Sequence, residues 1–95
     1  MKFSWNRSKA EINLQKHGVS FAEASTVFDD FWQENYPDPA HSVGEMRYIC
    51  LGISDKGRVL FVSYTERPDH YRLISAREAT KQEARKYYEA RSDYS

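Results

Sequence analysis

Cysteine, proline and glycine are all scarce in this sequence, which has one, three and four of them among 95 residues. The single cysteine, Cys50, excludes an intramolecular disulfide and a zinc site built on several cysteines. Its apolar neighbours predict that its thiol is buried. Because the four glycines are not clustered, the chain also lacks a glycine-rich loop of the kind that cradles phosphate groups.

Long apolar runs are missing as well. No segment approaches the roughly 18 apolar residues that are needed to span a bilayer. The N-terminal segment, MKFSWNRSKA, lacks the apolar stretch of a secretion signal. We therefore expect a cytoplasmic protein that does not enter a membrane.

The chain carries no excess charge of either sign, because 14 Lys and Arg residues balance 14 Asp and Glu residues. This balance excludes the global basic field of an autonomous nucleic-acid-binding domain, so any contact with a polyanion must come from a local patch. Residues 45–95 hold ten basic and eight acidic residues, a net charge of +2. The length predicts one domain, residues 1–95, with no room for a second core.

Three segments carry the Ser/Thr-x-x-Glu pattern of a capping box, in which a hydroxyl caps the third amide of a helix and a glutamate caps back. The patterns begin at Ser8, Ser20 and Thr80. They predict helices over about residues 9–17, 21–28 and 81–91. Gly18 stands where the first helix needs a left-handed residue after its end.

Residues 47–77 show a different pattern, in which β-branched and aromatic residues alternate or run together between turn residues. We predict an antiparallel meander of three strands, RYICLGIS, RVLFVSYTE and HYRLISAR. Gly57 suits the left-handed position of the first hairpin loop, and Pro68 breaks the second pair of strands. Shorter strands are expected at residues 3–5 and 32–36.

The predicted element order is therefore β-α-α-β-β-β-β-α. An antiparallel sheet and helices in this order predict an α+β fold in which the helices pack on one face of the sheet.

Charged residues within or just after the predicted strands are the first candidates for a functional site, since a charge there needs a partner or a ligand. One interpretation is a structural Glu–Arg ion pair at the end of the sheet. The other is metal-free RNA cleavage, which needs a base for the 2′-hydroxyl proton, an acid for the leaving oxygen and cations for the phosphorane charge. The residues that supply these groups are His41, Glu45, Arg47, Glu66, Arg67 and Arg77.

The register of the meander decides which of these side chains share a face. With one bulge in the first hairpin loop, Tyr64 and Glu66 share a face with apolar residues of the first two strands. A two-residue turn after Arg67 would add Arg77 to this face, whereas a three-residue loop would add Arg72 instead.

The three histidines are scattered, which is a weak signal for a metal site, and we expect neither a metal nor another cofactor. His41 lies in a polar loop, where it is suited to acid–base chemistry but is equally explained as a solvated loop residue. His17 is placed to support the end of the first helix, and His70 is interpreted as a surface residue beside a turn. On the last helix, Tyr87 and Tyr88 could contact a phosphate or a base, although helical spacing favours a core position for one of them.

Taken together, three blocks resemble the BrnT family of toxins from bacterial type II toxin–antitoxin modules. They are KHGVSFAEASTVFDD, AHSVGEMRYICLGIS and VSYTERPDHYRLISAREAT. The resemblance covers about residues 3–90. No single block is decisive, but KHG-x-SF, HS-x-x-E-x-R, YTER and ISAR in this order make a specific combination.

The resemblance implies a RelE-like fold and a metal-independent ribonuclease that inhibits translation by cutting RNA. It also implies a BrnA-like ribbon-helix-helix antitoxin, which neutralises the toxin and connects it to operator DNA. When the family's site residues are carried over onto the matching blocks, the residues that the resemblance implies are catalytic are His41, Glu45, Glu66, Arg67 and Arg77. The residues expected to bind the RNA substrate are Arg47, Tyr64, Arg72, Tyr87 and Tyr88.

A second hypothesis is a non-catalytic module that pairs with a DNA-binding antitoxin and modulates repression of the operon. The same arginines would then hold acidic residues of that partner. The neutral net charge favours this alternative, and toxicity of the protein when expressed alone distinguishes the two.

Overall fold

The computed structural model describes residues 1–93 and contains a five-stranded sheet in the order β1-β5-β4-β3-β2. The strands are β1 (Phe3–Ser4), β2 (Glu34–Pro37), β3 (Tyr48–Ile53), β4 (Val59–Glu66) and β5 (Tyr71–Glu78). The helices are α1 (Arg7–His17), α2 (Phe21–Ser25) and α3 (Lys81–Ser92), with 3-10 turns η1 (Thr26–Asp29) and η2 (Pro39–His41). This element order confirms the predicted α+β fold.

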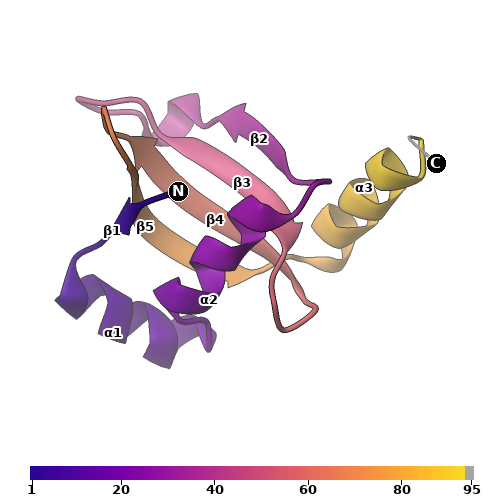
Figure 1. Ribbon diagram of the computed structural model, residues 1–95, viewed down its shortest axis with the longest axis horizontal. Helices are drawn as coiled ribbons and strands as arrows, with labels where there is room; N and C mark the ends of the chain where they lie inside the picture. The colour runs from indigo at the N-terminus through magenta and orange to yellow at the C-terminus, as the bar shows by residue number, and fades with distance from the viewer. Residues whose placement is uncertain (94–95) are drawn as a thin grey trace.

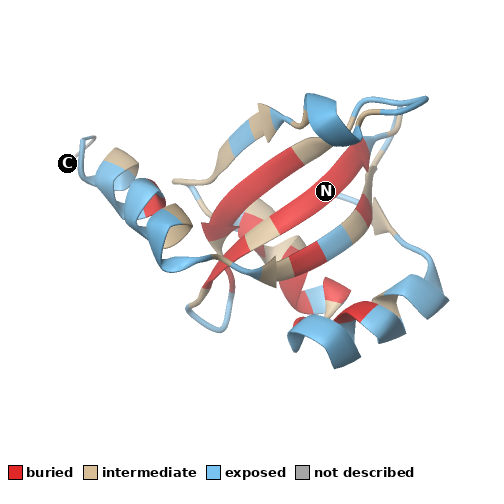
Figure 2. Ribbon diagram, turned by 180° about the vertical axis from the view of Figure 1, so that it is seen from behind, coloured by how far each residue is buried: buried red, intermediate tan, exposed pale blue. Residues whose placement is uncertain are grey.

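Two helices cover one face of the sheet, and the third lies at its end. Figure 1 shows α1 and α2 together on one side, whereas Figure 2 shows the other face with no helix across its central strands. Beneath α2 and η1, Phe21 and Val27 pack with Leu60 and Val62 of β4 in the larger core. On the opposite face, α3 buries Tyr87 in a smaller core, where it packs with Leu51 and Val59. The prediction that all helices lie on one face is therefore wrong for α3.

The helix ends follow from local hydrogen bonds, with two differences from the prediction. The helix predicted over residues 21–28 ends at Ser25 and is followed by the 3-10 turn η1. The side chain of Asn6, not that of Ser8, caps α1 by accepting from the Lys9 amide at 3.0 Å. Ser20 caps α2, and Thr80 forms the complete capping box of α3, as predicted. Gly18 ends α1 in the left-handed region, with φ of 69°.

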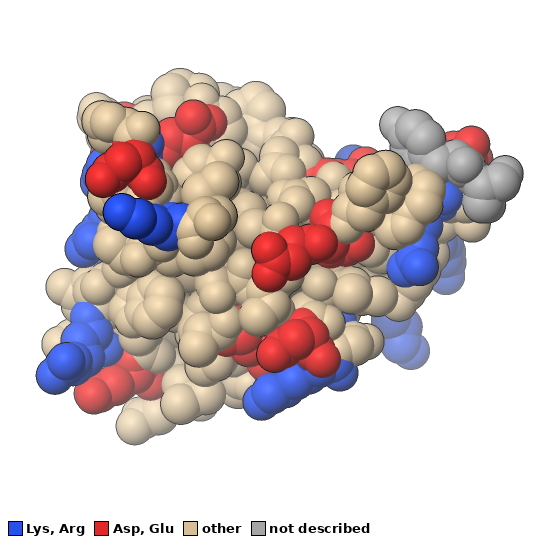
Figure 3. Space-filling view, viewed as in Figure 1, with Lys and Arg blue, Asp and Glu red and all other residues tan. Residues whose placement is uncertain are grey.

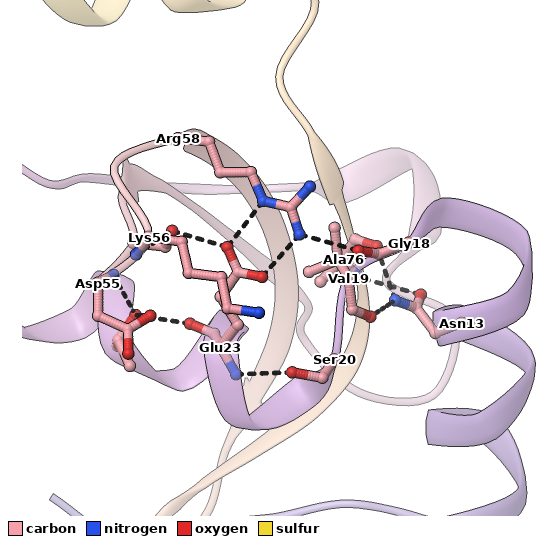
Figure 4. Close-up of polar contacts among 11 residues, drawn as sticks. Asn13, Gly18, Val19, Ser20, Glu23, Asp55, Lys56, Arg58 and Ala76 are labelled. Atoms are coloured by element: carbon pink, nitrogen blue, oxygen red, sulfur yellow. Dashed lines mark hydrogen bonds and ion pairs between the residues drawn. The ribbon is translucent and has the colours of Figure 1, made fainter.

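The outer edge of β5 is closed by α1 through a buried side chain, that of Asn13. β1 pairs with β5 only at Tyr71 and Arg72. Further along β5, the Asn13 Nδ2 donates to the carbonyls of Ala76 (2.8 Å) and Val19 (2.9 Å), and the Ala76 amide donates to Asn13 Oδ1 at 3.1 Å (Figure 4). A single amide side chain therefore takes the place of a neighbouring strand.

Replacing Asn13 with alanine is expected to lower the free energy of unfolding by about 2 kcal/mol, because two carbonyls and one amide lose their partner in a buried setting. Urea unfolding followed by circular dichroism measures the change. The adjacent variant I12A is the control, since Ile12 is 62% exposed and its truncation should alter stability by less than about 0.5 kcal/mol. Equal effects of the two variants would contradict this role of Asn13.

A buried ion pair connects α2 to the start of β4. Glu23 is 4% exposed and accepts from Arg58 Nε (2.8 Å), Arg58 Nη2 (2.7 Å) and the Ser54 hydroxyl (2.7 Å). Arg58 also donates to the carbonyl of Gly18 at 2.8 Å (Figure 4). The hydrogen bond from Arg58 holds the pKa of the Glu23 carboxyl below its ordinary value. The pair thereby joins the end of α1, α2 and the first hairpin.

A β-bulge in the second hairpin changes which side chains share a face. The turn is the two-residue one, since the Arg67 amide donates to the His70 carbonyl at 2.8 Å. Beyond it, Tyr64 pairs with Leu73 but Ser63 pairs with Ser75, which leaves Ile74 as an extra residue.

The bulge reverses the alternation of β5 beyond Ile74. Arg72 pairs with Thr65 and Arg77 pairs with Phe61, so both arginines project from the face opposite Tyr64. The prediction that Arg72 or Arg77 shares a face with Tyr64 is therefore wrong. In a regular strand, side chains five positions apart point to opposite faces, but the extra residue Ile74 brings Arg72 and Arg77 to the same face.

Cys50 is fully buried, as predicted, and burial raises the pKa of its thiol to about 12. Within residues 1–93, no helix combines the length and the apolar character that crossing a bilayer requires.

Candidate functional site

The sheet face that α1 and α2 leave uncovered is here called the open face. Along β4 and β5 it carries three cross-strand pairs, Thr65 with Arg72, Ser63 with Ser75 and Phe61 with Arg77. α3 covers only the end of this face that holds Phe61. Ser63 and Thr65 are only 8% and 1% exposed, so longer side chains cover their hydroxyl groups, whereas Ser75 is exposed. Along β4 and β5 the open face therefore carries a row of hydroxyl groups, two of them buried, with an arginine near each end.

At one end of the open face, Arg67 holds a carboxylate from another part of the chain. Its Nη1 donates to Glu45 Oε2 at 2.9 Å and to the Thr65 hydroxyl at 3.1 Å. The side chains of Arg67 and Glu45 are 33% and 46% exposed, so the pair is open to solvent. The loop between β2 and β3 thus places an acid–base group beside a cation on the sheet.

A second polar chain adjoins this pair and ends on Arg72. The Asp69 carboxylate lies 2.7 Å from Nδ1 of His70, whose Nε2 lies 2.9 Å from the Ser4 hydroxyl. Ser4 also accepts from Arg72 at 3.2 Å. The bond to His70 holds the pKa of the Asp69 carboxyl below its ordinary value. Because both ring nitrogens of His70 are engaged, this histidine positions Ser4 and Arg72.

Arg77 lies at the other end of the open face and is tied to α3. Its guanidinium makes two hydrogen bonds to the Glu83 carboxylate, of 2.7 and 3.0 Å, and lies 4.0 Å from the centre of the Phe61 ring. The bonds from Arg77 lower the pKa of Glu83. Arg67 and Arg77 are thus on one face but are held by different carboxylates.

The structure places the remaining charged candidates as follows. In η2, His41 is held through Nδ1 by Asp38 at 2.8 Å, and its side chain is 69% exposed. Arg47 is half-buried at the end of the loop that carries Glu45. Glu66 is exposed at the end of β4, where strand alternation directs it away from the open face. The structure therefore groups Glu45 with Arg67 and separates Glu66 from them.

Two of the three candidate tyrosines are core residues. Tyr64 is 3% exposed and donates to Asn35 at 2.7 Å, and burial raises the pKa of its hydroxyl. Tyr87 is fully buried and donates to the Asp30 carboxylate. Only Tyr88, which is 45% exposed, presents its ring to solvent. Direct substrate contact, as predicted for Tyr64 and Tyr87, is inconsistent with this burial.

Sequence reasoning missed Ser4, Thr65 and His70. Thr65 stands two positions before Arg67, a spacing that places both side chains on one face of a strand, so that signal was present. Ser4 and His70 meet because β1 pairs in parallel with β5 across 66 residues, which no local pattern indicates.

The arrangement of the Arg67 end suits recognition of a phosphodiester. Arg67, which directly follows β4, contacts Thr65, and Arg72 on β5 pairs with Thr65. Guanidinium groups bind phosphate oxygens through paired hydrogen bonds. Within residues 1–93, no three His, Cys, Asp or Glu side chains gather as a metal-binding group.

Comparison with known proteins identifies a matching family. The family model described as "Ribonuclease toxin, BrnT, of type II toxin-antitoxin system" matches residues 5–83. Among solved structures, the crystal structure of the Brucella abortus ribonuclease toxin BrnT is similar, with a TM-score of 0.67 and 23% sequence identity. That match covers 85% of this chain and 99% of the Brucella chain, and it supports the fold. No curated protein sequence matched the chain.

Proposed function

This chain belongs to the BrnT family of ribonuclease toxins of type II toxin–antitoxin systems, and we propose that it is a metal-independent endoribonuclease that inhibits translation in the cytoplasm. The observation that carries the proposal is the pairing of the Glu45 carboxylate with Arg67 at 2.9 Å, on a sheet face that no helix covers at this end. This geometry sets a carboxylate beside a guanidinium group, which supports the proposed roles of proton acceptor for Glu45 and phosphate-binding cation for Arg67.

The proposed reaction uses the RNA's own 2′-hydroxyl as the nucleophile. Glu45 takes the 2′-hydroxyl proton, and the oxygen attacks the adjacent phosphorus. Arg67 and Arg72 stabilise the charge that builds on the phosphorane oxygens. The bond to the 5′-oxygen then breaks, which leaves a 2′,3′-cyclic phosphate and a 5′-hydroxyl.

We assign His41 to protonation of the leaving 5′-oxygen. Asp38 holds its Nδ1, and among residues 1–93 its Nε2 has no hydrogen-bond partner, so that nitrogen is free to face a substrate. His70 has neither nitrogen free. The two histidines therefore take different roles, proton transfer for His41 and positioning of Arg72 for His70.

Arg77 and Tyr88 are proposed to bind a nucleotide next to the scissile one. Arg77 lies on the open face at the α3 end, and the exposed ring of Tyr88 on α3 offers a surface for stacking on a base. Arg47, next to the Glu45 loop, is proposed to contact the backbone of the same strand.

A type II toxin–antitoxin system includes an antitoxin partner. We propose that the partner of this chain is a BrnA-like ribbon-helix-helix protein, and that operator DNA is bound only through it. The antitoxin then both blocks RNA cleavage and carries the toxin into the repressor complex.

Expression of this chain alone in a heterologous bacterium tests the function. We expect growth arrest with RNA breakdown, and rescue by the antitoxin gene encoded beside it. The purified protein should cleave RNA in the presence of EDTA and leave 2′,3′-cyclic phosphate ends. Normal growth and intact RNA, with soluble protein verified, would instead support a non-catalytic module that modulates repression.

A further inference from the structure

A groove runs between α1 and the bulged part of β5, outside the residues assigned to catalysis. It encloses about 200 Å³, and its lining includes Lys9, Ile12, Lys16, His17, Ile74 and Ser75. Ile74 is the extra residue of the β-bulge. The groove thus lies where β5 departs from regular strand pairing and where α1 covers the outer edge of β5.

The groove and the open face share one residue, Ser75. This serine lines the groove and pairs with Ser63 in the middle of the open face, between the Arg67 and Arg77 ends. A strand bound across the open face therefore meets the groove at the edge of the sheet.

Two lysines of the groove carry charge that the protein does not neutralise. Lys9 and Lys16 lie seven residues apart on α1, on the same side of the helix and about 10 Å apart along its axis. Within residues 1–93 neither forms an ion pair, whereas Arg58, Arg67 and Arg77 each bind a carboxylate. On the face that α1 and α2 cover, Figure 3 shows small groups of basic and acidic side chains that often adjoin one another, without a continuous basic field. Because the net charge of the chain is zero, a polyanion is attracted by local unpaired positive charge of this kind and not by the chain as a whole.

We propose that this groove binds the phosphodiester backbone of RNA at a distance from the scissile bond, with Lys9 and Lys16 as the phosphate contacts. The inference rests on the proposed ribonuclease function and extends its substrate site across the β5 edge to α1. His17 and Ser75 add hydrogen-bonding groups along the same path.

The test compares RNA binding by the full chain, the variants K16A and K9A/K16A, and the control K56A. Lys56 is also exposed and outside ion pairs within residues 1–93, but it lies in the turn between β3 and β4 and not in the groove. The probe is a single-stranded 2′-O-methyl oligonucleotide of about 12 nucleotides, which binds without being cut. Cleavage of unmodified RNA by each preparation is measured in parallel.

We expect K9A/K16A to weaken binding about tenfold or more at 0.1 M salt and to reduce the slope of log K against log salt by about 1.4, since each phosphate contact on a single strand contributes about 0.7. K16A should reduce the slope by about half as much as K9A/K16A does, and K56A should bind RNA with the affinity and the slope of the wild type. The loss of affinity in K9A/K16A should be larger for longer oligonucleotides.

Four results would overturn the inference. Wild-type binding by K9A/K16A would exclude these phosphate contacts, and an equal loss in K56A would show an effect of net charge alone. Unchanged RNA binding with weakened antitoxin binding would assign the groove to the protein partner. If the wild-type chain itself neither binds nor cleaves RNA, the proposed function fails, and the groove assignment fails with it.

Discussion

Replacing Arg67 with alanine is expected to slow RNA cleavage by about 100-fold or more, because in the proposed mechanism Arg67 donates to the phosphorane oxygens as their charge develops. It also releases Glu45, which Arg67 holds at 2.9 Å. Single-turnover cleavage of a labelled oligonucleotide measures the effect on the chemical step.

Arg67→Lys serves as the conservative variant. Lysine keeps the charge but not the planar guanidinium, whose Nη1 donates to both Glu45 and Thr65, so a smaller loss of cleavage activity than in R67A is expected. Because the Arg67–Glu45 pair is exposed, R67A should change the free energy of unfolding by less than about 1 kcal/mol. Full cleavage activity in a folded R67A protein would remove Arg67 from the site.

Replacing Arg58 with alanine should lower the free energy of unfolding by about 3 kcal/mol, because it leaves the buried Glu23 carboxylate without its cation. The Glu23 side chain is 2% exposed, whereas that of Glu45, the partner of Arg67, is 46% exposed. Arg58 also donates to the carbonyl of Gly18, so the loss reaches the end of α1. Urea unfolding measures the change. R67A is the matched control, since it breaks an ion pair of the same chemistry at an exposed site.

The dependence of this loss on pH identifies its cause. The folded pKa of Glu23 lies below its ordinary value of 4.5, chiefly through the hydrogen bond from Arg58. The pair therefore contributes its full stability above about pH 4.5, and this contribution disappears as the pH falls through the lowered pKa. The difference between wild type and R58A should narrow in acid. A difference that is constant from neutral pH to about pH 3 would mean that packing, not the ion pair, is lost.

Local signals predicted most of the fold. The Thr80 capping box, the left-handed Gly18 and Gly57, and the alternating residues of the meander all act over a few positions, and each appears where it was expected. The burial of Cys50 followed from its neighbours in the same way. Such features are fixed by short-range sterics and hydrogen bonds, so the sequence displays them directly.

Features that depend on distant pairing could not be predicted. The bulge at Ile74 and the parallel pairing of β1 with β5 decide which side chains reach the open face, and neither has a local signature. The same limit applies to the candidate site. The resemblance made both Glu45 and Arg67 candidates, but the role of Ser4 and His70 depends on a contact between positions 66 residues apart in the sequence.

The way in which Asn13 closes β5 has a consequence for the behaviour of the protein in the cell. An uncovered strand edge is a template on which other chains add by backbone pairing. Here the cover at Ala76 is one amide side chain on a helix whose other residues are mostly exposed, so local detachment of α1 bares the edge while the rest of the sheet stays folded. Aggregation of this protein should therefore begin at β5, at temperatures below the main unfolding transition, and N13A should lower that onset further.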